Sequence, residues 1–281
     1  VDPHARLTID ADGHFVDTFG RSVVLRGVNT GGRSKWAPYV PFQIADDEPM
    51  ASFEAAADVY FARAQAWGLD TVRMPFSWEG LEPAQGTYDT RYLDRYVAMI
   101  RSAWRHELRV IVDFHQDVYA SQFCGDGFPP WTVADILTGP PRRDCARWFM
   151  NYTQDAGVKA AFDRFWDPTS ATRAGFEAMW ELMIGRAKDE PGVLGFEIIN
   201  EPGWGTAEVE AWRRDVLTPF YSEMAAKFQG WSPDHLVFYD GLGIDAVSPA
   251  AGHIHPDGTG LVFAPHHYDF GLLFGGRWSG I

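Results

Sequence analysis

The stretch Phe196-Glu197-Ile198-Ile199-Asn200-Glu201-Pro202 decides the fold of this chain. It continues an apolar run that starts at Val193, and such a short run, rich in β-branched and aromatic residues, predicts a strand buried on both faces. The polar residues Asn200 and Glu201 follow at its carboxyl end. Because active sites of α/β barrels gather at the carboxyl ends of their strands, the stretch predicts a strand that carries a carboxyl group into a barrel mouth.

Five other segments repeat the pattern of a short apolar run that ends in polar residues. They are residues 23–29, 71–77, 109–117, 235–240 and 261–268. Between the strands, apolar residues recur at intervals of three and four. This periodicity predicts helices over residues 52–67, 90–105, 171–188 and 207–227. Strands that alternate with helices imply a parallel sheet with right-handed crossovers.

Two α/β architectures compete for this pattern. A doubly wound sheet would carry a glycine-rich phosphate turn after its first strand, but Gly27-Val28-Asn29-Thr30-Gly31-Gly32 lacks the GxGxxG spacing. Polar residues at the end of every strand favour a (β/α)8 TIM barrel. We therefore expect one barrel domain over residues 1–281. This chain supplies about six of the strands and a hairpin around Asp12-Gly13 that plugs the bottom of the barrel.

Composition narrows the classes of partner. The 281 residues carry a net charge of −14, which argues against nucleic acid and anionic membranes because both attract clustered Lys and Arg. No window approaches the roughly 20 apolar residues of a transmembrane helix. The first residue is Val1 rather than Met, and we expect a soluble, secreted protein.

The segment after the third predicted strand, residues 118–151, is expected to be a structured insertion. A disulfide between its two cysteines, Cys124 and Cys145, would brace it in an oxidising compartment, and two free thiols are the alternative. Its aromatic side chains either wall a substrate cleft or pack on each other as a satellite core. These aromatic residues are Phe123, Phe128, Trp131, Trp148 and Phe149, together with Tyr152 directly after the insertion.

Several motifs together resemble glycoside hydrolase family five, a family of retaining enzymes with a (β/α)8 barrel. The resemblance rests on Arg73 with Pro75, on His115, on the stretch from Phe196 to Pro202, and on His266-His267-Tyr268. It implies that Glu201 is the acid/base catalyst and that Arg73 orients the nucleophile. It also implies that His115 and Asn200 bind sugar hydroxyls, and that Tyr268 and His266 serve the nucleophile's side.

Within that family the sequence looks most like the endoglycoceramidases, which release an intact glycan from a glycosphingolipid. The likeness lies in Gly32-Arg33-Ser34-Lys35, in His115-Gln116-Asp117 and in the loop from Cys124 to Trp131. It implies that Lys35, Asp117 and Trp131 grip the sugar next to the ceramide. Such a charged pair can hold hydroxyls while an indole stacks on the ring. Relatives that act on glucosylceramide, steryl glucosides or soluble polysaccharides are the alternatives.

Some polar residues have structural interpretations. We expect Glu197 to be a buried partner of Arg73, and Asp240 and Asp269 to support loops. A cluster of imidazole and carboxylate groups offers zinc-ligand chemistry: His115, Asp117, His266 and His267. Sugar sites use the same residue types for hydrogen bonding, so we expect no metal and no cofactor.

The sequence departs from the family at its end. The family's nucleophile, a glutamate at the end of the seventh strand, has no counterpart here, and the chain ends at Gly280-Ile281. An open barrel would expose two sheet edges. We therefore expect a second polypeptide or a C-terminal remainder to supply the last two strands. The alternative from another functional class is an inactive fragment that binds glycans or glycolipids.

Overall fold

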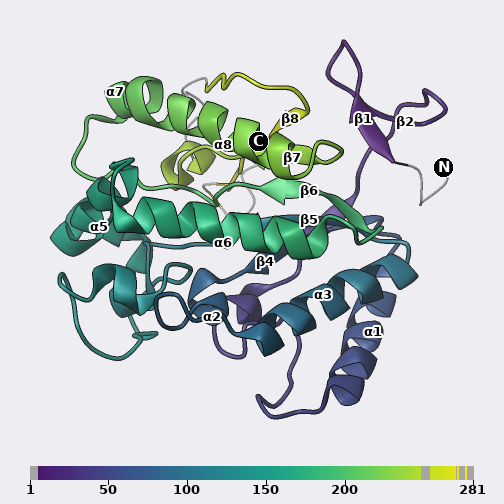
Figure 1. Ribbon diagram of the computed structural model, residues 1–281, viewed down its shortest axis with the longest axis horizontal. Helices are drawn as coiled ribbons and strands as arrows, with labels where there is room; N and C mark the ends of the chain where they lie inside the picture. Colours follow the sequence, from purple (N-terminus) through teal and green to yellow (C-terminus); the bar gives the residue numbers. More distant parts are fainter. Residues whose placement is uncertain (1–5, 248–253, 270, 272–275, 277–281) are drawn as a thin grey trace.

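A parallel sheet of six strands forms the centre of the computed structural model, which describes residues 6–247, 254–269, 271 and 276 (Figure 1). Val1 and Gly280-Ile281 lie outside the described residues. The strands pair in sequence order, and all five pairings are parallel. They are β3 Gly27–Asn29, β4 Thr71–Phe76, β5 Arg109–Phe114, β6 Val193–Glu197, β7 Leu236–Tyr239 and β8 Leu261–Phe263. A doubly wound sheet reverses its strand order at a switch point, so this uninterrupted order is that of a barrel wall.

Helices join successive strands of this sheet. The long ones are α1 Met50–Ala66, α3 Thr90–Arg105, α5 Ala156–Trp166, α6 Ala171–Ala187 and α8 Thr218–Trp231. Short helical segments lie between them: α2 Trp78–Leu81, α4 Asn151–Gln154, α7 Val209–Trp212, a π-turn at Arg213–Leu217, and 3-10 turns at Gly32–Lys35, Ser121–Phe123, Pro130–Val133, Trp148–Met150 and Gly243–Val247. Figure 1 shows α1 and α3 side by side and α6 lying along the sheet. No helix in the described part of the chain has the length and apolar character needed to cross a membrane.

The predicted strands are confirmed with shorter ends, α3 has its predicted bounds, and α1 begins two residues earlier than predicted. β4, β5 and β7 stop before the polar residues that follow them, whereas β3 includes Asn29. The helix predicted over residues 207–227 is divided into α7, the π-turn and α8. Pro219 at the start of α8 has no N–H to donate to the preceding turn, and the π-turn takes up this interruption. α5 was not predicted from the sequence.

The insertion divides its aromatic residues between the core and the surface, so neither interpretation of it holds for all of them. Phe128 joins the main core, with ring centroids 5.3 Å from Phe114 and 5.6 Å from Trp78. Trp148 and Phe149 remain 37% and 45% exposed. The insertion is therefore anchored to the barrel through its first half and exposes apolar rings in its second.

The N-terminal hairpin forms as predicted. Its strands, β1 Leu7–Ile9 and β2 Phe15–Asp17, pair antiparallel. Leu7 is buried in a small cluster with Leu194 and Leu236, which lie at the amino ends of β6 and β7. The hairpin thus covers the end of the sheet opposite to the predicted site.

A substitution of Gly195 in β6 tests how closely β6 and β7 pack. A side chain at this position would collide with the backbone carbonyl of Leu236, which cannot move without breaking the sheet. We expect Gly195→Ala to lower the free energy of unfolding by about 2 kcal/mol or more, measured by urea denaturation of the full-length protein.

The matched control is Gly185→Ala on the exposed face of α6, where an added methyl group meets nothing within 4 Å. Alanine is the better helix former, so this variant should gain up to about 1 kcal/mol. Equal effects of the two substitutions would contradict the close packing of β6 against β7.

Candidate active site

A cavity of about 320 Å³ opens at the carboxyl ends of the strands. Residues of β3 and β4 and of the segments after β3, β5, β6 and β8 meet there, although they are far apart in the sequence. Its lining consists of Asn29, Gly31, Gly32, Lys35, Arg73, Pro75, His115, Asp117, Asn200, His266, His267 and Tyr268. The cavity therefore brings together most of the residues that the sequence singled out.

Glu201 lies directly behind this lining and is 7% exposed. Its Oε1 accepts hydrogen bonds from Tyr268 Oη at 3.0 Å and from His266 Nδ1 at 2.6 Å. The structure shows that both residues contact Glu201, and the expectation that they serve the nucleophile's side stays a prediction. The chain after β8 crosses toward the end of β6, and this path brings the two side chains to the carboxyl group of Glu201.

The backbone of Glu201 is held in an unusual conformation. Its φ is 38°, in the left-handed region that non-glycine residues rarely adopt. Its N–H donates to Asp240 Oδ2 at 3.1 Å, and the same oxygen lies 3.4 Å from His266 Nε2. Burial, against the opposing charge of His266, raises the pKa of Asp240 to about 8. Asp240 thus has the supporting role that was expected for it, and it supports Glu201 directly.

Arg73 is the central cation of the barrel interior. It donates to both carboxylate oxygens of Glu197, at 2.6 and 2.8 Å, and forms an ion pair with Asp113 at 2.9 Å. It also donates to Asn200 Oδ1 at 2.9 Å. Burial lowers the guanidinium pKa, but the charges of Asp113 and Glu197 outweigh burial and raise it. The prediction that Glu197 is the buried partner of Arg73 is confirmed.

His115 lies between two carboxylates. Its Nδ1 is 2.9 Å from Asp113 Oδ2, and its Nε2 is 3.7 Å from Asp117 Oδ2. Burial and the charge of Lys35 lower the imidazole pKa, but the two carboxylates outweigh them and raise it to about 9. Near neutral pH His115 is therefore an imidazolium whose Nδ1 donates to Asp113 and whose Nε2–H has no hydrogen-bond partner among the described residues.

Lys35 and Asp117 form an ion pair in the cavity wall. Burial acts to raise the pKa of Asp117, but the charge of Lys35 outweighs it and lowers this pKa to about 2. Both groups line the cavity, so the pair presents an ammonium and a carboxylate to whatever binds there. Charged donors and acceptors make the stronger class of hydrogen bond, which suits the hydroxyl groups of a sugar.

With this geometry in place, the chain can be compared with known proteins. The sequence pattern described as Cellulase (glycosyl hydrolase family 5) matches residues 16–279. The chain belongs to glycosyl hydrolase family 5. Endoglycoceramidase I of Rhodococcus hoagii is 30% identical over 200 residues, which are 71% of this chain and 38% of that protein. A glucosylceramidase of Cryptococcus neoformans var. grubii is 37% identical over 134 residues, which are 45% of this chain and 18% of that protein.

Among solved structures, the complex of endo-glycoceramidase II from Rhodococcus sp. with ganglioside GM3 superposes with a TM-score of 0.77 at 27% identity. The match covers 95% of this chain and 61% of that one. The chain thus spans less than two thirds of the length of each of these relatives. Each relative is itself a single longer chain, so the comparisons lend no support to a separate second polypeptide.

Gln116, for which no role was predicted from the sequence, connects the backbone at Asn200 and Glu201 with Tyr152. Its Nε2 donates to the carbonyl oxygens of Asn200 and Glu201, at 2.7 and 2.8 Å, and to Tyr152 Oη at 3.0 Å. Asn200 Nδ2 in turn donates to Gln116 O at 2.9 Å. The only signal in the sequence was its place between His115 and Asp117, because its partners lie far along the chain.

Trp131 does not reach the sugar site, and this prediction is corrected. It is not among the described residues that line the cavity. Its indole N–H donates to Glu82 O at 3.1 Å, and its ring meets Trp78 edge to face at 5.4 Å. The 3-10 turn at Pro130–Val133 points the ring toward the core between α2 and α6. The side chain therefore packs in the core, whereas it was expected to bind sugar.

Four groups in the described part of the chain have ligand atoms close enough to hold a metal ion, and two of them lie at the site: His115 with Asp117 and Asp126, and Glu197 with Asp240 and His266. In each of these two, one carboxylate is already paired with a cation. Lys35 pairs with Asp117, and Arg73 pairs with Glu197. The donor sets are thus used within the protein, which agrees with a site that binds hydroxyl groups.

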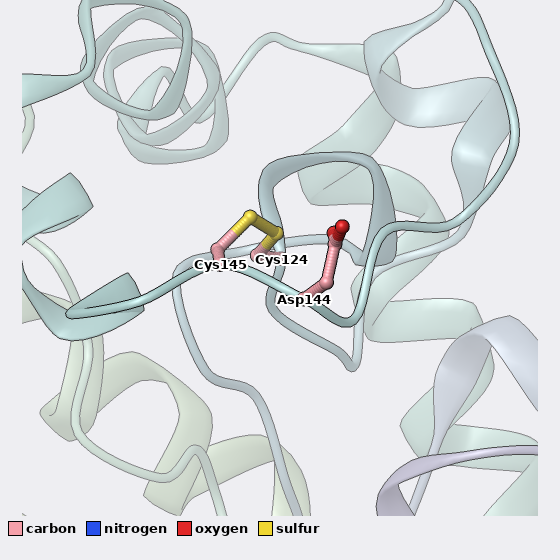
Figure 2. Close-up of side chains that lie close together, drawn as sticks. All are labelled: Cys124, Asp144 and Cys145. Atoms are coloured by element: carbon pink, nitrogen blue, oxygen red, sulfur yellow. A yellow bond between two sulfur atoms is a disulfide. The ribbon is translucent and has the colours of Figure 1, made fainter.

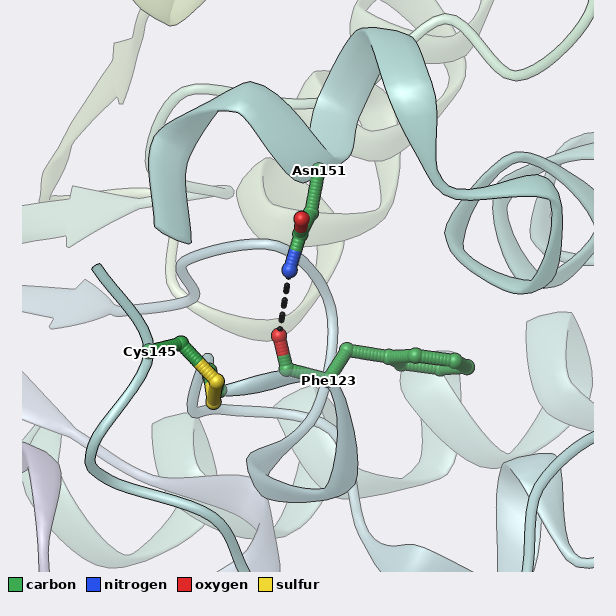
Figure 3. The surroundings of a disulfide bond; sticks show 4 residues. Phe123, Cys145 and Asn151 are labelled. Carbon is green, nitrogen blue, oxygen red and sulfur yellow. Dashed lines mark hydrogen bonds between the residues drawn. A yellow bond between two sulfur atoms is a disulfide. The ribbon is translucent and has the colours of Figure 1, made fainter. Parts of the chain in front are cut away.

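The insertion is joined by a disulfide between Cys124 and Cys145, whose Cα atoms are 6.0 Å apart (Figures 2 and 3). Asp144 lies beside it in Figure 2, but sulfurs in a disulfide offer no thiolate to a metal. Figure 3 shows Asn151 donating to Phe123 O, at 2.9 Å. The two halves of the insertion are therefore cross-linked next to Gln116 and Tyr152.

We expect Glu197→Gln to lower the free energy of unfolding by about 3 kcal/mol, because it leaves the buried Arg73 without one of its two charged partners. The control is Glu210→Gln, which removes an ion pair with Arg213. The Glu210 side chain in this pair is 65% exposed. The Glu210→Gln substitution should lower the free energy of unfolding by less than about 1 kcal/mol. Both are measured by denaturant unfolding, and a Glu197→Gln effect as small as the control would contradict the central role of this pair.

Proposed function

We propose that the protein carrying this chain is a retaining β-glycosidase that cleaves the bond between glycan and ceramide in glycosphingolipids. The observation that carries the proposal is the carboxyl group of Glu201 at the mouth of a family 5 barrel, bonded to His266 and Tyr268 beside a cavity lined with charged hydrogen-bonding groups. The substrate is a glycolipid or an oligosaccharide, and the proposed reaction uses no cofactor.

The proposed reaction is a double displacement. A glutamate outside these 281 residues attacks the anomeric carbon while Glu201 protonates the departing oxygen of the aglycone. Glu201, then a carboxylate, takes a proton from water, and this water releases the glycan. The two carboxyl groups must lie roughly 5 Å apart for this course.

The charged groups of the cavity hold the sugar in this proposal. The imidazolium of His115 and the ammonium of Lys35 donate to hydroxyl oxygens, and Asp117 accepts from hydroxyl groups. Asn200 has two amide hydrogens, of which one is donated to Gln116 O. The other is the donor to the sugar 2-hydroxyl, a contact that strengthens as the transition state forms.

The insertion supports a lipid aglycone. The general acid stands on the side of the leaving group, and Gln116 joins the backbone of Glu201 to Tyr152 in α4. Trp148 and Phe149, whose rings meet at 6.1 Å, are exposed a few residues earlier. Exposed apolar rings next to the leaving-group side suit a ceramide better than a second sugar. The disulfide suits an oxidising compartment and therefore a secreted protein.

Glucosylceramide is the second candidate substrate, favoured by the similarity to a glucosylceramidase. A panel of lactosylceramide, glucosylceramide, a steryl glucoside and soluble cellulose oligomers separates the candidates. We expect release of intact lactose from lactosylceramide, detected by mass spectrometry. Release of glucose from glucosylceramide alone would replace the proposed substrate, and cleavage of cellulose oligomers alone would remove the lipid from the proposal.

Glu201→Gln tests the catalytic assignment in the full-length protein. We expect the loss of natural-substrate turnover, because the amide cannot protonate the leaving oxygen, and rescue by azide of aryl glycosides with good leaving groups. Wild-type rates on the natural substrate would contradict the assignment. Glu210→Gln, at an exposed position that is not among the described residues lining the cavity, is the charge-matched control.

The intact mass under denaturing conditions tests where the rest of the barrel lies. A single longer chain that contains these residues fits the proposal. A second species of roughly a fifth to a half of this chain's mass fits the expectation of a separate polypeptide. A mass equal to this chain alone, with binding of lactosylceramide but no hydrolysis, would favour the inactive glycolipid binder.

A further inference from the structure

The loop Cys124-Gly125-Asp126-Gly127 is pressed against the end of β5. Asp117 and Asp126 exchange backbone hydrogen bonds at 2.9 and 3.3 Å, and Phe128 N donates to Tyr119 O at 2.9 Å. These bonds form outside the barrel sheet, between the segment that carries the site and the start of the insertion. Asp126 is therefore placed by the backbone of Asp117 itself.

Two glycines permit this close approach. A Cβ atom at Gly125 would collide with Asp117 O, and one at Gly127 would lie 2.5 Å from His115 O. The φ of Gly127 is 106°, which also requires glycine. On the N-terminal side of Asp126, the disulfide between Cys124 and Cys145 ties the loop to the second half of the insertion. The position of the Asp126 carboxyl group is thus fixed from both sides.

The carboxyl group of Asp126 faces the charged wall of the cavity from behind. It is 2% exposed, it is not among the described residues that line the cavity, and it has an oxygen within 4.8 Å of ligand atoms of His115 and Asp117. The titratable groups that act on it come from four segments: Lys35, Tyr39, Glu79, His115 and Asp117. The Asp126 carboxyl group therefore lies next to the Lys35–Asp117 ion pair and behind the described residues that line the cavity.

The neighbouring carboxyl groups of Asp117 and Asp126 have shifted pKa values of opposite direction. Burial first, and then the charge of Asp117, raise the pKa of Asp126 to about 8, whereas Lys35 lowers that of Asp117 to about 2. Near neutral pH Asp126 is a neutral carboxyl group with one O–H donor, beside an ionised partner. A second negative charge at this place would compete with Asp117 for Lys35.

We propose that Asp126 is a positioning residue that holds the Lys35–Asp117 ion pair in the arrangement that binds the sugar. The inference rests on the proposed function, because it takes this pair to be the part of the site that contacts substrate. It assigns the glycine-flanked, disulfide-tied loop a role in substrate binding that is exerted through two other residues.

Two substitutions of Asp126 test the inference kinetically in the full-length protein. Asp126→Asn keeps the size and neutrality of the group and should leave KM within about threefold of wild type near pH 6. Asp126→Ala removes the buried carboxyl group from behind the ion pair and should raise KM about tenfold or more with a smaller change in kcat. Asp144→Asn, an exposed carboxyl group in the same insertion, is the control and should behave as wild type.

The pH profile separates positioning from a merely structural role. In the wild type, ionisation of Asp126 above about pH 8 should raise KM, because the new charge draws Lys35 from Asp117. Asp126→Asn should lack this alkaline rise. An unchanged rise in Asp126→Asn, or equal KM values for the Asn and Ala variants, would overturn the inference.

A folding experiment gives a readout without activity. A carboxyl group whose pKa is raised in the folded state contributes stability that is present below its ordinary pKa of 3.8 and is lost as pH rises toward 8. The Tm of Asp126→Asn should therefore exceed that of wild type by a margin that grows between about pH 4 and pH 8. With Asp117→Asn in the background, the margin should shrink.

The two failures are distinguishable. A wild-type protein that hydrolyses no glycolipid contradicts the proposed function, whatever Asp126 does. A Tm margin that is independent of pH, or that is the same with and without Asp117, overturns the role of Asp126 even in an active glycosidase.

Discussion

The bidentate ion pair between Arg73 and Glu197 is the interaction on which the rest of the site depends. It joins β4 to β6, and through Asp113 it includes the strand between them. Neighbouring strands in this sheet hold each other through backbone bonds, and these side chains connect β4 with β6 across the interior. Because Arg73 also donates to Asn200, the same cation fixes the residue that precedes the proposed acid.

The buried carboxyl groups around this cation fall into two kinds. Asp113, Asp117 and Glu197 each have a cation in direct contact, and the charges of Arg73 and Lys35 lower the pKa of Asp113 and of Asp117 against the effect of burial. Asp126 and Asp240, whose pKa values burial raises to about 8, keep a proton near neutral pH. A cluster with this many acidic groups is tolerable in a buried place only if some of them are neutral, since isolated buried charges are expensive. The neutral ones are those that support others from behind the cavity.

The sequence predicts the strands well because their signal is local. Each strand is a short apolar run, and the polar residues after it must lie at the same edge of a parallel sheet. This reasoning places Arg73, His115, Asn200 and Glu201 together and finds Glu197 as a buried partner. It fails where a side chain's direction depends on distant contacts. Trp131 turns into the core because a 3-10 turn aims it at Trp78.

Gln116 was equally out of reach, because its partners at Asn200 and Tyr152 become neighbours only when the barrel forms. The direction of Tyr268 and His266 also depends on the path of the chain after β8, which no local pattern encodes. What a single sequence gives is thus the edge of the sheet on which polar groups gather. Which of them touch each other follows from tertiary packing.

The insertion is a fixed support behind the site, and the physical reason lies in its anchors. A lid that opens must part from the core at little cost, with few buried contacts at its base. Here Phe128 packs against Phe114 and Trp78 in the barrel core, and backbone bonds tie Asp126 to Asp117. The disulfide and Asn151 then hold the second half to the first. Opening this segment would expose core aromatic rings and would pull Asp126 from the ion pair, so substrate must enter a site whose support is already in place.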